Sequence, residues 1–200
     1  MKGLVDSRNV HTIKRDFAGV AAFIAIIWIV YALDRFLPLE NFGLVPRTVR
    51  GLTGIVAMPF LHGDFAHLLG NTIPLAITTL LLAGSRANSG IIVVMIALLC
   101  GMGVWLFGRT ALHIGASGVV FGLIAFHVFA GVFEKRLKSV VLAAVVGFLY
   151  ASTLLQGIVP FQRGVSWEGH LIGAVAGAFV ALVVSRTLKD PLSASGKQRQ

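Results

Sequence analysis

Residues 89–107 read SGIIVVMIALLCGMGVWLF, and no charged side chain interrupts this run. About 20 predominantly apolar residues are needed for one helix to cross the hydrocarbon core of a bilayer. The run has this length, and the 200-residue chain contains five further segments of the same character. The six spans are expected at about residues 17–37, 65–84, 89–107, 117–133, 138–157 and 168–185. The predicted fold class is therefore an all-α polytopic membrane protein with six transmembrane helices.

The composition of the whole chain supports the same class. Apolar residues make up 56% of the chain and charged residues only 12%, against a charged share of about 25% in soluble domains. A water-soluble domain of this size could not bury so much apolar surface, and a disordered chain would not contain it. The single cysteine, Cys100, offers no disulfide framework. No metal, nucleotide or flavin motif is present, so no cofactor is expected.

The net charge of +9 predicts an orientation in the membrane, not a nucleic-acid partner, because the basic residues are scattered at segment ends. With six spans both termini lie on one side, and that side collects twelve of the 17 Lys and Arg residues. We therefore expect both termini to be cytoplasmic. The expected parts are a cytoplasmic segment at 1–16, a membrane domain at 17–186 with a long first loop at 38–64, and a cytoplasmic tail at 187–200.

Polar residues gather at one depth of the expected bundle. Spans two, four and six all begin at the outer face, and His67, Asn71, Ser117 and His170 fall within about their first two turns. His67 and Asn71 are four residues apart and share one helix face. A serine, a base and side-chain donors at one level are the groups that acyl transfer needs.

Simpler structural interpretations exist for individual members of this group. A serine at a helix start is a common N-cap, so Ser117 alone is a weak signal. His62 and Asp64, at the start of span two, are equally well explained as residues solvated by lipid headgroups. His127 lies about 15 Å deeper than Ser117 and is interpreted as a histidine of the bundle interior. Glu168 is better placed to complement a helix N-terminus than to orient His170.

Small residues predict close packing of two of the spans. Gly118 and Gly122 lie on one face of span four, and Gly173 and Gly177 share a face of span six with His170. Glycine lets neighbouring backbones approach closely in a membrane. We therefore expect spans four and six to come close enough for Ser117 and His170 to form a hydrogen bond.

Three motifs in order resemble those of the rhomboid intramembrane serine proteases. They are H-x4-H-x3-N at His62, His67 and Asn71, G-x-S-G at Gly115, Ser117 and Gly118, and G-H-x-x-G at Gly169, His170 and Gly173. The six-span plan and the long first loop are also similar to that family. Each motif is weak alone, and the ordered trio on the right spans is specific.

The resemblance implies a role for each matched residue. Ser117 would be the nucleophile and His170 the general base, in a catalytic dyad without a carboxylate. His67 and Asn71, with the Ser117 backbone N–H, would hold the oxyanion. The site would be supported by Gly115, Gly118, Phe121 and Gly173.

The chain also departs from the family pattern in two places. Phe121 stands where the family often has a tyrosine, which keeps a stacking surface and loses the hydroxyl. The Trp-Arg pair often seen in the first loop is absent around residues 54–58. This puts the details of the loop in doubt, not the dyad.

The implied partners are transmembrane protein substrates and the lipid bilayer, with no nucleic acid. A spanning helix hides its peptide bonds in its own hydrogen bonds, so a substrate would need helix-breaking Gly or Pro near the outer face. The implied location is a cell membrane, expected to be a bacterial or archaeal plasma membrane.

Two other classes of function stay open from the sequence. A non-proteolytic rhomboid-like chaperone or trafficking factor would typically lack the serine or the histidine, and both are present here. A channel or transporter would need polar residues along a path through the membrane, whereas here they cluster at one end. Other intramembrane protease chemistries fail, because the chain has neither H-E-x-x-H nor a pair of mid-span aspartates.

Overall fold

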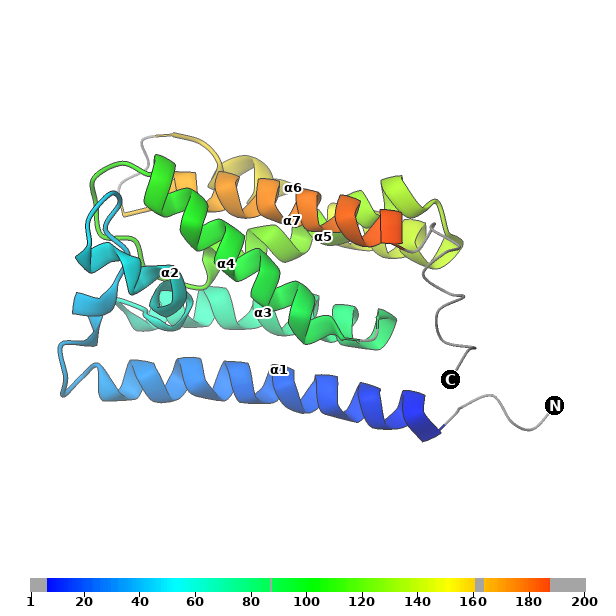
Figure 1. The fold of residues 1–200 in the computed structure, drawn as a ribbon, viewed down its shortest axis with the longest axis horizontal. Helices are drawn as coiled ribbons and strands as arrows, with labels where there is room; N and C mark the ends of the chain where they lie inside the picture. The colour runs from blue at the N-terminus through cyan, green and yellow to red at the C-terminus, as the bar shows by residue number, and fades with distance from the viewer. Residues whose placement is uncertain (1–6, 87, 161–163, 188–200) are drawn as a thin grey trace, which may run out of the picture.

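The computed structural model describes residues 7–86, 88–160 and 164–187, and this part of the chain is helical (Figure 1). Six of its helices are long and apolar enough to cross a membrane, as the sequence predicted. They are α1 (Ser7–Leu33), α3 (Phe65–Ser85), α4 (Ser89–Phe107), α5 (Ser117–Glu134), α6 (Leu137–Gly157) and α7 (Trp167–Thr187). A short helix, α2 (Gly54–Ala57), lies in the first loop.

Five of the six expected spans agree with the observed helices to within two residues at each end. The exception is α1, which begins ten residues earlier than expected and ends at Leu33 instead of residue 37. Only Lys14–Leu33 of this helix has the apolar character of a span. Asp16 lies near the start of this stretch and is buried, and its carboxylate accepts a hydrogen bond from the Ser89 backbone N–H (3.2 Å) at the start of α4.

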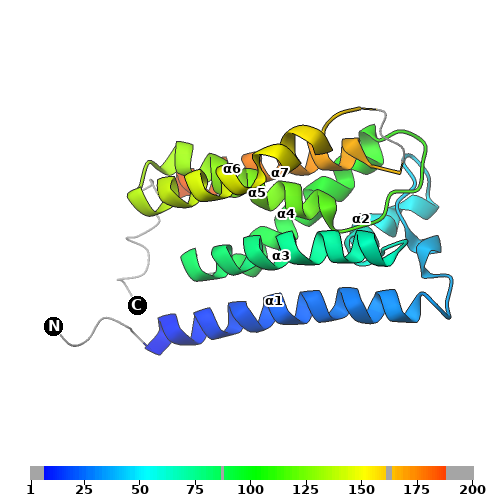
Figure 2. The ribbon, with the colours of Figure 1, turned by 180° about the vertical axis from the view of Figure 1, so that it is seen from behind.

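Helix α5 is the centre of the bundle, and α3, α4, α6 and α7 pack around it (Figures 1 and 2). In its most apolar stretch 67% of the residues are buried, against 6% for α1 and 11% for α6. α5 packs mainly against α7 and α6, whereas α1 lies along the outside of α3. The residues at the start of α5 are therefore held by several neighbours at once.

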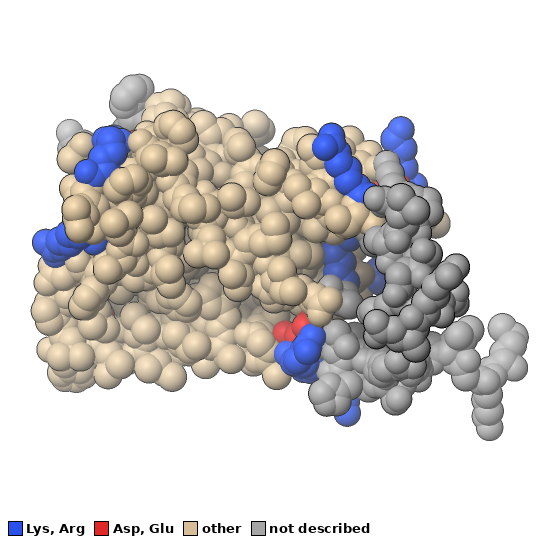
Figure 3. Space-filling view, viewed as in Figure 1, with Lys and Arg blue, Asp and Glu red and all other residues tan. Residues whose placement is uncertain are grey.

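Charged side chains lie at the two ends of the molecule on the face shown in Figure 3, and the band between them is uncharged. This is the surface that a bilayer-spanning protein requires. The start of α1 and the end of α7 lie at the same end of the bundle (Figure 1). Which side of the membrane that end faces stays a prediction, and residues 1–6 and 188–200 of the expected terminal segments lie outside the described residues.

The first loop is built from short helical turns: η1 (Leu39–Phe42), η2 (Arg50–Leu52), α2 and η3 (Met58–Phe60). It is fastened to the end of α4, where the Trp105 indole N–H donates to the Thr48 carbonyl (2.9 Å). Leu44 is fully buried and forms an isolated antiparallel bridge with His113, in the loop before α5. The first loop therefore supports the segment that leads into Ser117.

Candidate active site

Ser117 is the first residue of α5, and the turn before it depends on a glycine. Gly115 has φ +108°, a conformation that side chains disfavour. A Cβ at this position would also lie 2.5 Å from His67 Nε2. The Gly115 N–H donates to the Met58 carbonyl (2.9 Å). Because the first N–H groups of a helix have no acceptor within the helix, the Ser117 N–H is free to face a ligand.

His170, in the first turn of α7, lies against Ser117. Its Nε2 is 2.9 Å from Ser117 Oγ, and its Nδ1 is 2.8 Å from the Gly157 carbonyl oxygen at the end of α6. A carbonyl oxygen only accepts, so Nδ1 carries the proton and donates it to Gly157. Nε2 is then the acceptor for the Ser117 hydroxyl. The Gly157 carbonyl thus orients the imidazole as a carboxylate does in a Ser-His-Asp triad.

The Phe121 ring holds the imidazole from one face. The two rings are stacked, with centroids 4.1 Å apart and planes 4° apart. A Cβ on Gly157 would overlap the Phe121 ring, so the end of α6 approaches this pair only because residue 157 is a glycine. The stack limits the rotation of His170 about its side-chain bonds.

His67 and Asn71 lie on the neighbouring helix α3, next to the Gly115 turn. The Asn71 side chain is buried, and its amide nitrogen has no hydrogen-bond partner. A buried donor without an acceptor is costly unless a ligand supplies one. Asn71 Nδ2 lies 3.4 Å from the position of a Cβ on Gly115, within one turn of the nucleophile. This placement suits a donor to an oxyanion.

His62 is buried among the residues of this corner, so its interpretation as a headgroup-solvated residue is wrong. Burial and the positive charge that His67 can carry lower the pKa of His62 from 6.5 to about 4. The neutral ring accepts a long hydrogen bond (3.4 Å) from the Ala116 N–H, directly before Ser117. Asp64 caps α3 by accepting from the His67 N–H (2.8 Å). His62 therefore holds the turn before Ser117, and Asp64 holds the first turn of α3.

Most of the side chains described above line one cavity of about 860 Å³. Its walls come from α3, α5, α6, α7 and the loop before α5, and they include Ser117, His170, His67, Asn71, Phe121, Ser152, Thr153 and Gln156. A second cavity of about 780 Å³ lies between α1 and α4 and is mainly apolar. It contains no pairing of a nucleophile with a base, so the chemistry is assigned to the first cavity.

The dyad rests on direct backbone contact between α5 and α7. A Cβ on Gly173 would overlap the Gly118 carbonyl oxygen, and one on Gly177 would overlap the Gly122 carbonyl oxygen. Any larger residue at these positions would push the two helices apart. This is the packing that the four glycines predicted.

The structure brings together Ser117, His170, His67 and Asn71, and it keeps His127 apart. His127 is buried, with Nε2 3.0 Å from the Thr78 carbonyl. The Gly157 carbonyl cannot be found from sequence motifs, because a backbone atom carries no sequence signal. The only sequence sign for His113 is its position four residues before Ser117.

The fold and this site define a six-span membrane protein with a serine and a histidine paired inside the bundle. A family model described as the Rhomboid domain matches residues 49–187. The chain belongs to the rhomboid family.

Similar proteins occur in mycobacteria. Uncharacterized proteins of Mycobacterium bovis and Mycobacterium tuberculosis are each 35% identical over 178 residues, covering 83% of this chain and 74% of the relative. An uncharacterized protein of Mycobacterium leprae is 33% identical over 178 residues, covering 83% of this chain and 70% of the relative.

Proposed function

We propose that this chain is a serine endopeptidase that cleaves membrane-spanning segments of other proteins near the outer face of the membrane. The observation that carries the proposal is the 2.9 Å contact between His170 Nε2 and Ser117 Oγ. A serine hydroxyl is a weak nucleophile until an adjacent base takes its proton, and this contact supplies the base. Membership of the rhomboid family supports the same assignment.

The geometry supports the following acylation step. Ser117 Oγ attacks the carbonyl carbon of the scissile peptide bond while its proton passes to His170 Nε2. The imidazolium keeps its Nδ1–H bond to the Gly157 carbonyl and then gives the Nε2 proton to the leaving amine. The C–N bond breaks, and the acyl group stays on Ser117 as an ester.

The ester is hydrolysed by the same two residues in reverse. A water molecule loses a proton to His170 and attacks the ester carbonyl, and the proton then returns to Ser117 as the acid product leaves. In both steps negative charge develops on the carbonyl oxygen. The Ser117 N–H, Asn71 Nδ2 and His67 are the donors placed to stabilise it.

The substrate class follows from the position of the cavity among the helices. The scissile bond must reach Ser117 in an extended form, because a helix keeps its peptide groups paired. We expect substrates to be transmembrane segments that are easily unwound by Gly or Pro near the outer face. The mycobacterial relatives favour a bacterial plasma membrane as the location. The excess of Lys and Arg on the side of the termini favours a cytoplasmic position for both.

Cleavage of a single-pass model substrate in proteoliposomes tests the proposal. Wild type is expected to cleave it, and Ser117→Ala and His170→Ala are expected to be inactive while keeping the wild-type unfolding temperature in detergent. A fluorophosphonate should label wild type and leave Ser117→Ala unlabelled. Activity near wild type in either variant would overturn the dyad. Absence of both cleavage and labelling in wild type would instead favour a non-proteolytic rhomboid-like chaperone.

A further inference from the structure

The glycine contacts between α5 and α7 fix the distance between the two helices more directly than their axial register. Side chains that interdigitate fix how far one helix slides along another, because ridges fit into grooves. Here the contact is made by backbone against backbone at Gly118 with Gly173 and at Gly122 with Gly177. Such a contact sets the distance between the helices better than their axial register. The 2.9 Å dyad contact needs that register to be fixed elsewhere.

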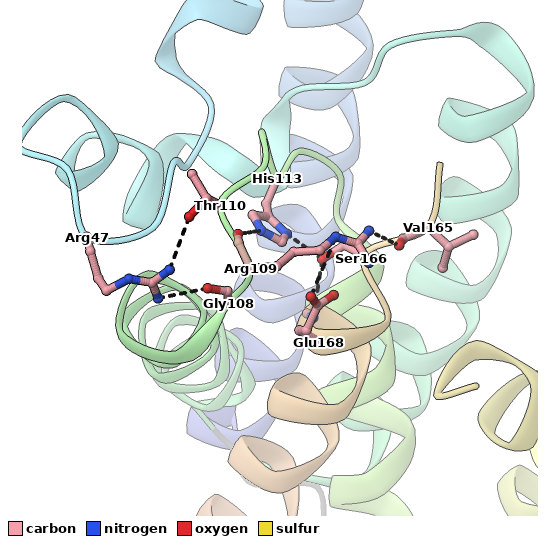
Figure 4. A network of polar contacts seen from close by, with 9 residues as sticks. Arg47, Gly108, Arg109, Thr110, His113, Val165, Ser166 and Glu168 are labelled. Carbon is pink, nitrogen blue, oxygen red and sulfur yellow. Dashed lines mark hydrogen bonds and ion pairs between the residues drawn. The ribbon is translucent and has the colours of Figure 1, made fainter. Parts of the chain in front are cut away.

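A second serine–histidine contact joins the two segments that precede α5 and α7 (Figure 4). His113 Nδ1 is 2.6 Å from Ser166 Oγ. His113 stands four residues before Ser117, and Ser166 stands four residues before His170. The contact therefore links the loop that leads into the nucleophile with the segment that leads into the base.

The hydrogen-bond roles in this second contact follow from its neighbours. His113 Nε2 is 3.1 Å from the Arg109 carbonyl oxygen, which only accepts, so Nε2 carries the proton. Nδ1 then accepts from the Ser166 hydroxyl. Ser166 Oγ in turn accepts from the Gly169 N–H (3.2 Å) in the first turn of α7. One continuous chain of hydrogen bonds thus joins the α7 N-terminus to the loop before α5.

Arg109 provides a parallel attachment at the surface of the same corner (Figure 4). Its Nη2 donates to the Val165 carbonyl (2.8 Å), and its Nε is 3.6 Å from Glu168 Oε1. The Arg109 side chain is 42% exposed, so this ion pair contributes less than its charge suggests. His113 is 1% exposed, which makes its bond to Ser166 the less solvated of the two attachments.

The loop that carries His113 is itself held from the other side. The His113 N–H donates to the Leu44 carbonyl (2.8 Å), and the His113 carbonyl accepts from the Leu44 N–H (3.0 Å). The Arg47 guanidinium donates to the Gly108 carbonyl (2.8 Å) and to Thr110 Oγ1 (3.4 Å) (Figure 4). The first loop is thus a fixed support against which His113 can hold α7.

We propose that His113 is a positioning residue for the general base: by holding Ser166, it sets the axial register of α7 on α5 and so keeps His170 in reach of Ser117. The inference rests on the proposed function only for its effect on turnover. Its structural content, the fastening of the α7 N-terminus by a part-buried hydrogen bond, stands on the contacts alone.

The first test compares turnover in three variants of this contact. Ser166→Ala removes the hydroxyl, and His113→Leu removes the acceptor while the Ser166 cap on Gly169 is kept. Each is expected to lower kcat about 10- to 100-fold, the effect of a displacement near 1 Å at a reacting pair. His113 and Ser166 also line the cavity, so KM is measured beside kcat, and a loss confined to KM would overturn the inference. Ser166→Thr keeps the hydroxyl and should restore kcat.

The double variant separates a shared contact from two independent effects. If the two side chains act through one bond, His113→Leu with Ser166→Ala should lower kcat no further than either change alone. Ser185→Ala is the matched control. Ser185 is a buried serine of the same helix whose hydroxyl donates to the Leu182 carbonyl (2.8 Å), so its loss should leave kcat unchanged.

A second readout does not depend on protease activity. Cys100 is the single cysteine of the chain, is buried, and its Sγ lies 3.5 Å from the Gly169 carbonyl at the start of α7. Loosening of this end of α7 should expose the thiol. N-ethylmaleimide should therefore label Cys100 faster in Ser166→Ala and His113→Leu than in wild type, Ser166→Thr or Ser185→Ala.

The two readouts distinguish failure of the inference from failure of the proposed function. Wild-type kcat in Ser166→Ala or His113→Leu, or fully additive losses in the double variant, would overturn the inference while the protease assignment stands. If wild type neither cleaves the model substrate nor reacts with a fluorophosphonate, the proposed function fails. The labelling rate of Cys100 then still decides the inference, and equal rates in all variants would overturn it.

Discussion

Replacing Gly173 by alanine is the sharpest test of how the helices that carry Ser117 and His170 are packed. The new Cβ would overlap the Gly118 carbonyl oxygen, which belongs to backbone and cannot rotate away. Restoring an ordinary contact would move α7 from α5 by on the order of 1 Å. The 2.9 Å contact between Ser117 and His170 would then exceed the range of a hydrogen bond.

Gly173→Ala is expected to lower both the stability of the fold and the turnover rate, and the two losses are measured separately. Overpacking of a tight contact lowers the free energy of unfolding by about 1–3 kcal/mol. Misplacement of the base by about 1 Å lowers kcat about 100-fold. Turnover of a model substrate in proteoliposomes reports the second part, and the thermal unfolding temperature in detergent reports the first.

A control glycine facing the same central helix is available on α6. A Cβ on Gly147 would lie 3.8 Å from Val128 Cγ2, an ordinary contact, so Gly147→Ala should keep both kcat and the unfolding temperature. Wild-type kcat in Gly173→Ala would refute a role for this contact in placing His170, because α7 could then accept a side chain without moving His170.

Three further results are expected. Asn71→Ala should lower kcat about 100- to 1000-fold with unchanged KM, the loss seen when one oxyanion donor is removed; an unchanged kcat in the proteoliposome assay would remove Asn71 from this role. Phe121→Tyr should keep turnover because it keeps the stacked ring, whereas Phe121→Leu should lower kcat by freeing the His170 ring; equal turnover in these two variants would contradict a role for the stack. The pKa of His62, lowered to about 4 by burial, means that the unfolded chain binds a proton between pH 6.5 and 4 that the folded chain does not. The contribution of His62 is therefore fully present above pH 6.5 and falls by about 3 kcal/mol as the pH drops through this window. Denaturant titrations in detergent should show that the free energy of unfolding falls less between pH 6.5 and 4 in His62→Gln than in wild type. The same dependence on pH in both proteins would contradict this role of His62.

Hydropathy was sufficient to find the six long helices, because each apolar run is bounded by glycine or charged residues. It was insufficient for the start of α1. Residues 7–13 continue the helix beyond the apolar stretch, and a helix outside the hydrocarbon region has no hydropathy signal. The end of α1 was overestimated for the opposite reason, since Phe36 and Leu37 are apolar but lie in the turn that follows Leu33.

The candidate site could be located from residue types and spacing because its side chains recur at helical periods. Spacing placed His67 with Asn71, and glycine at a helical repeat placed His170 beside Ser117. Residue spacing could not identify the acceptor of the His170 Nδ1–H bond. That acceptor is the carbonyl of Gly157, and every residue has a carbonyl. Nor could it pair His113 with Ser166, because contacts between distant segments arise only when the loops are placed in space.

The orientation of His170 depends on α6, because its imidazole donates a hydrogen bond to the Gly157 carbonyl at the end of that helix. α6 packs chiefly on α5 and barely touches α7, yet its last residue orients the imidazole. The same helix forms one wall of the cavity through Ser152, Thr153 and Gln156. An outward swing of α6 that widens the cavity would therefore withdraw the acceptor from Nδ1 at the same moment. Under the proposed function, admission of a substrate and cleavage of its peptide bond are then successive events, and the chain is inactive while α6 stays in the outward position.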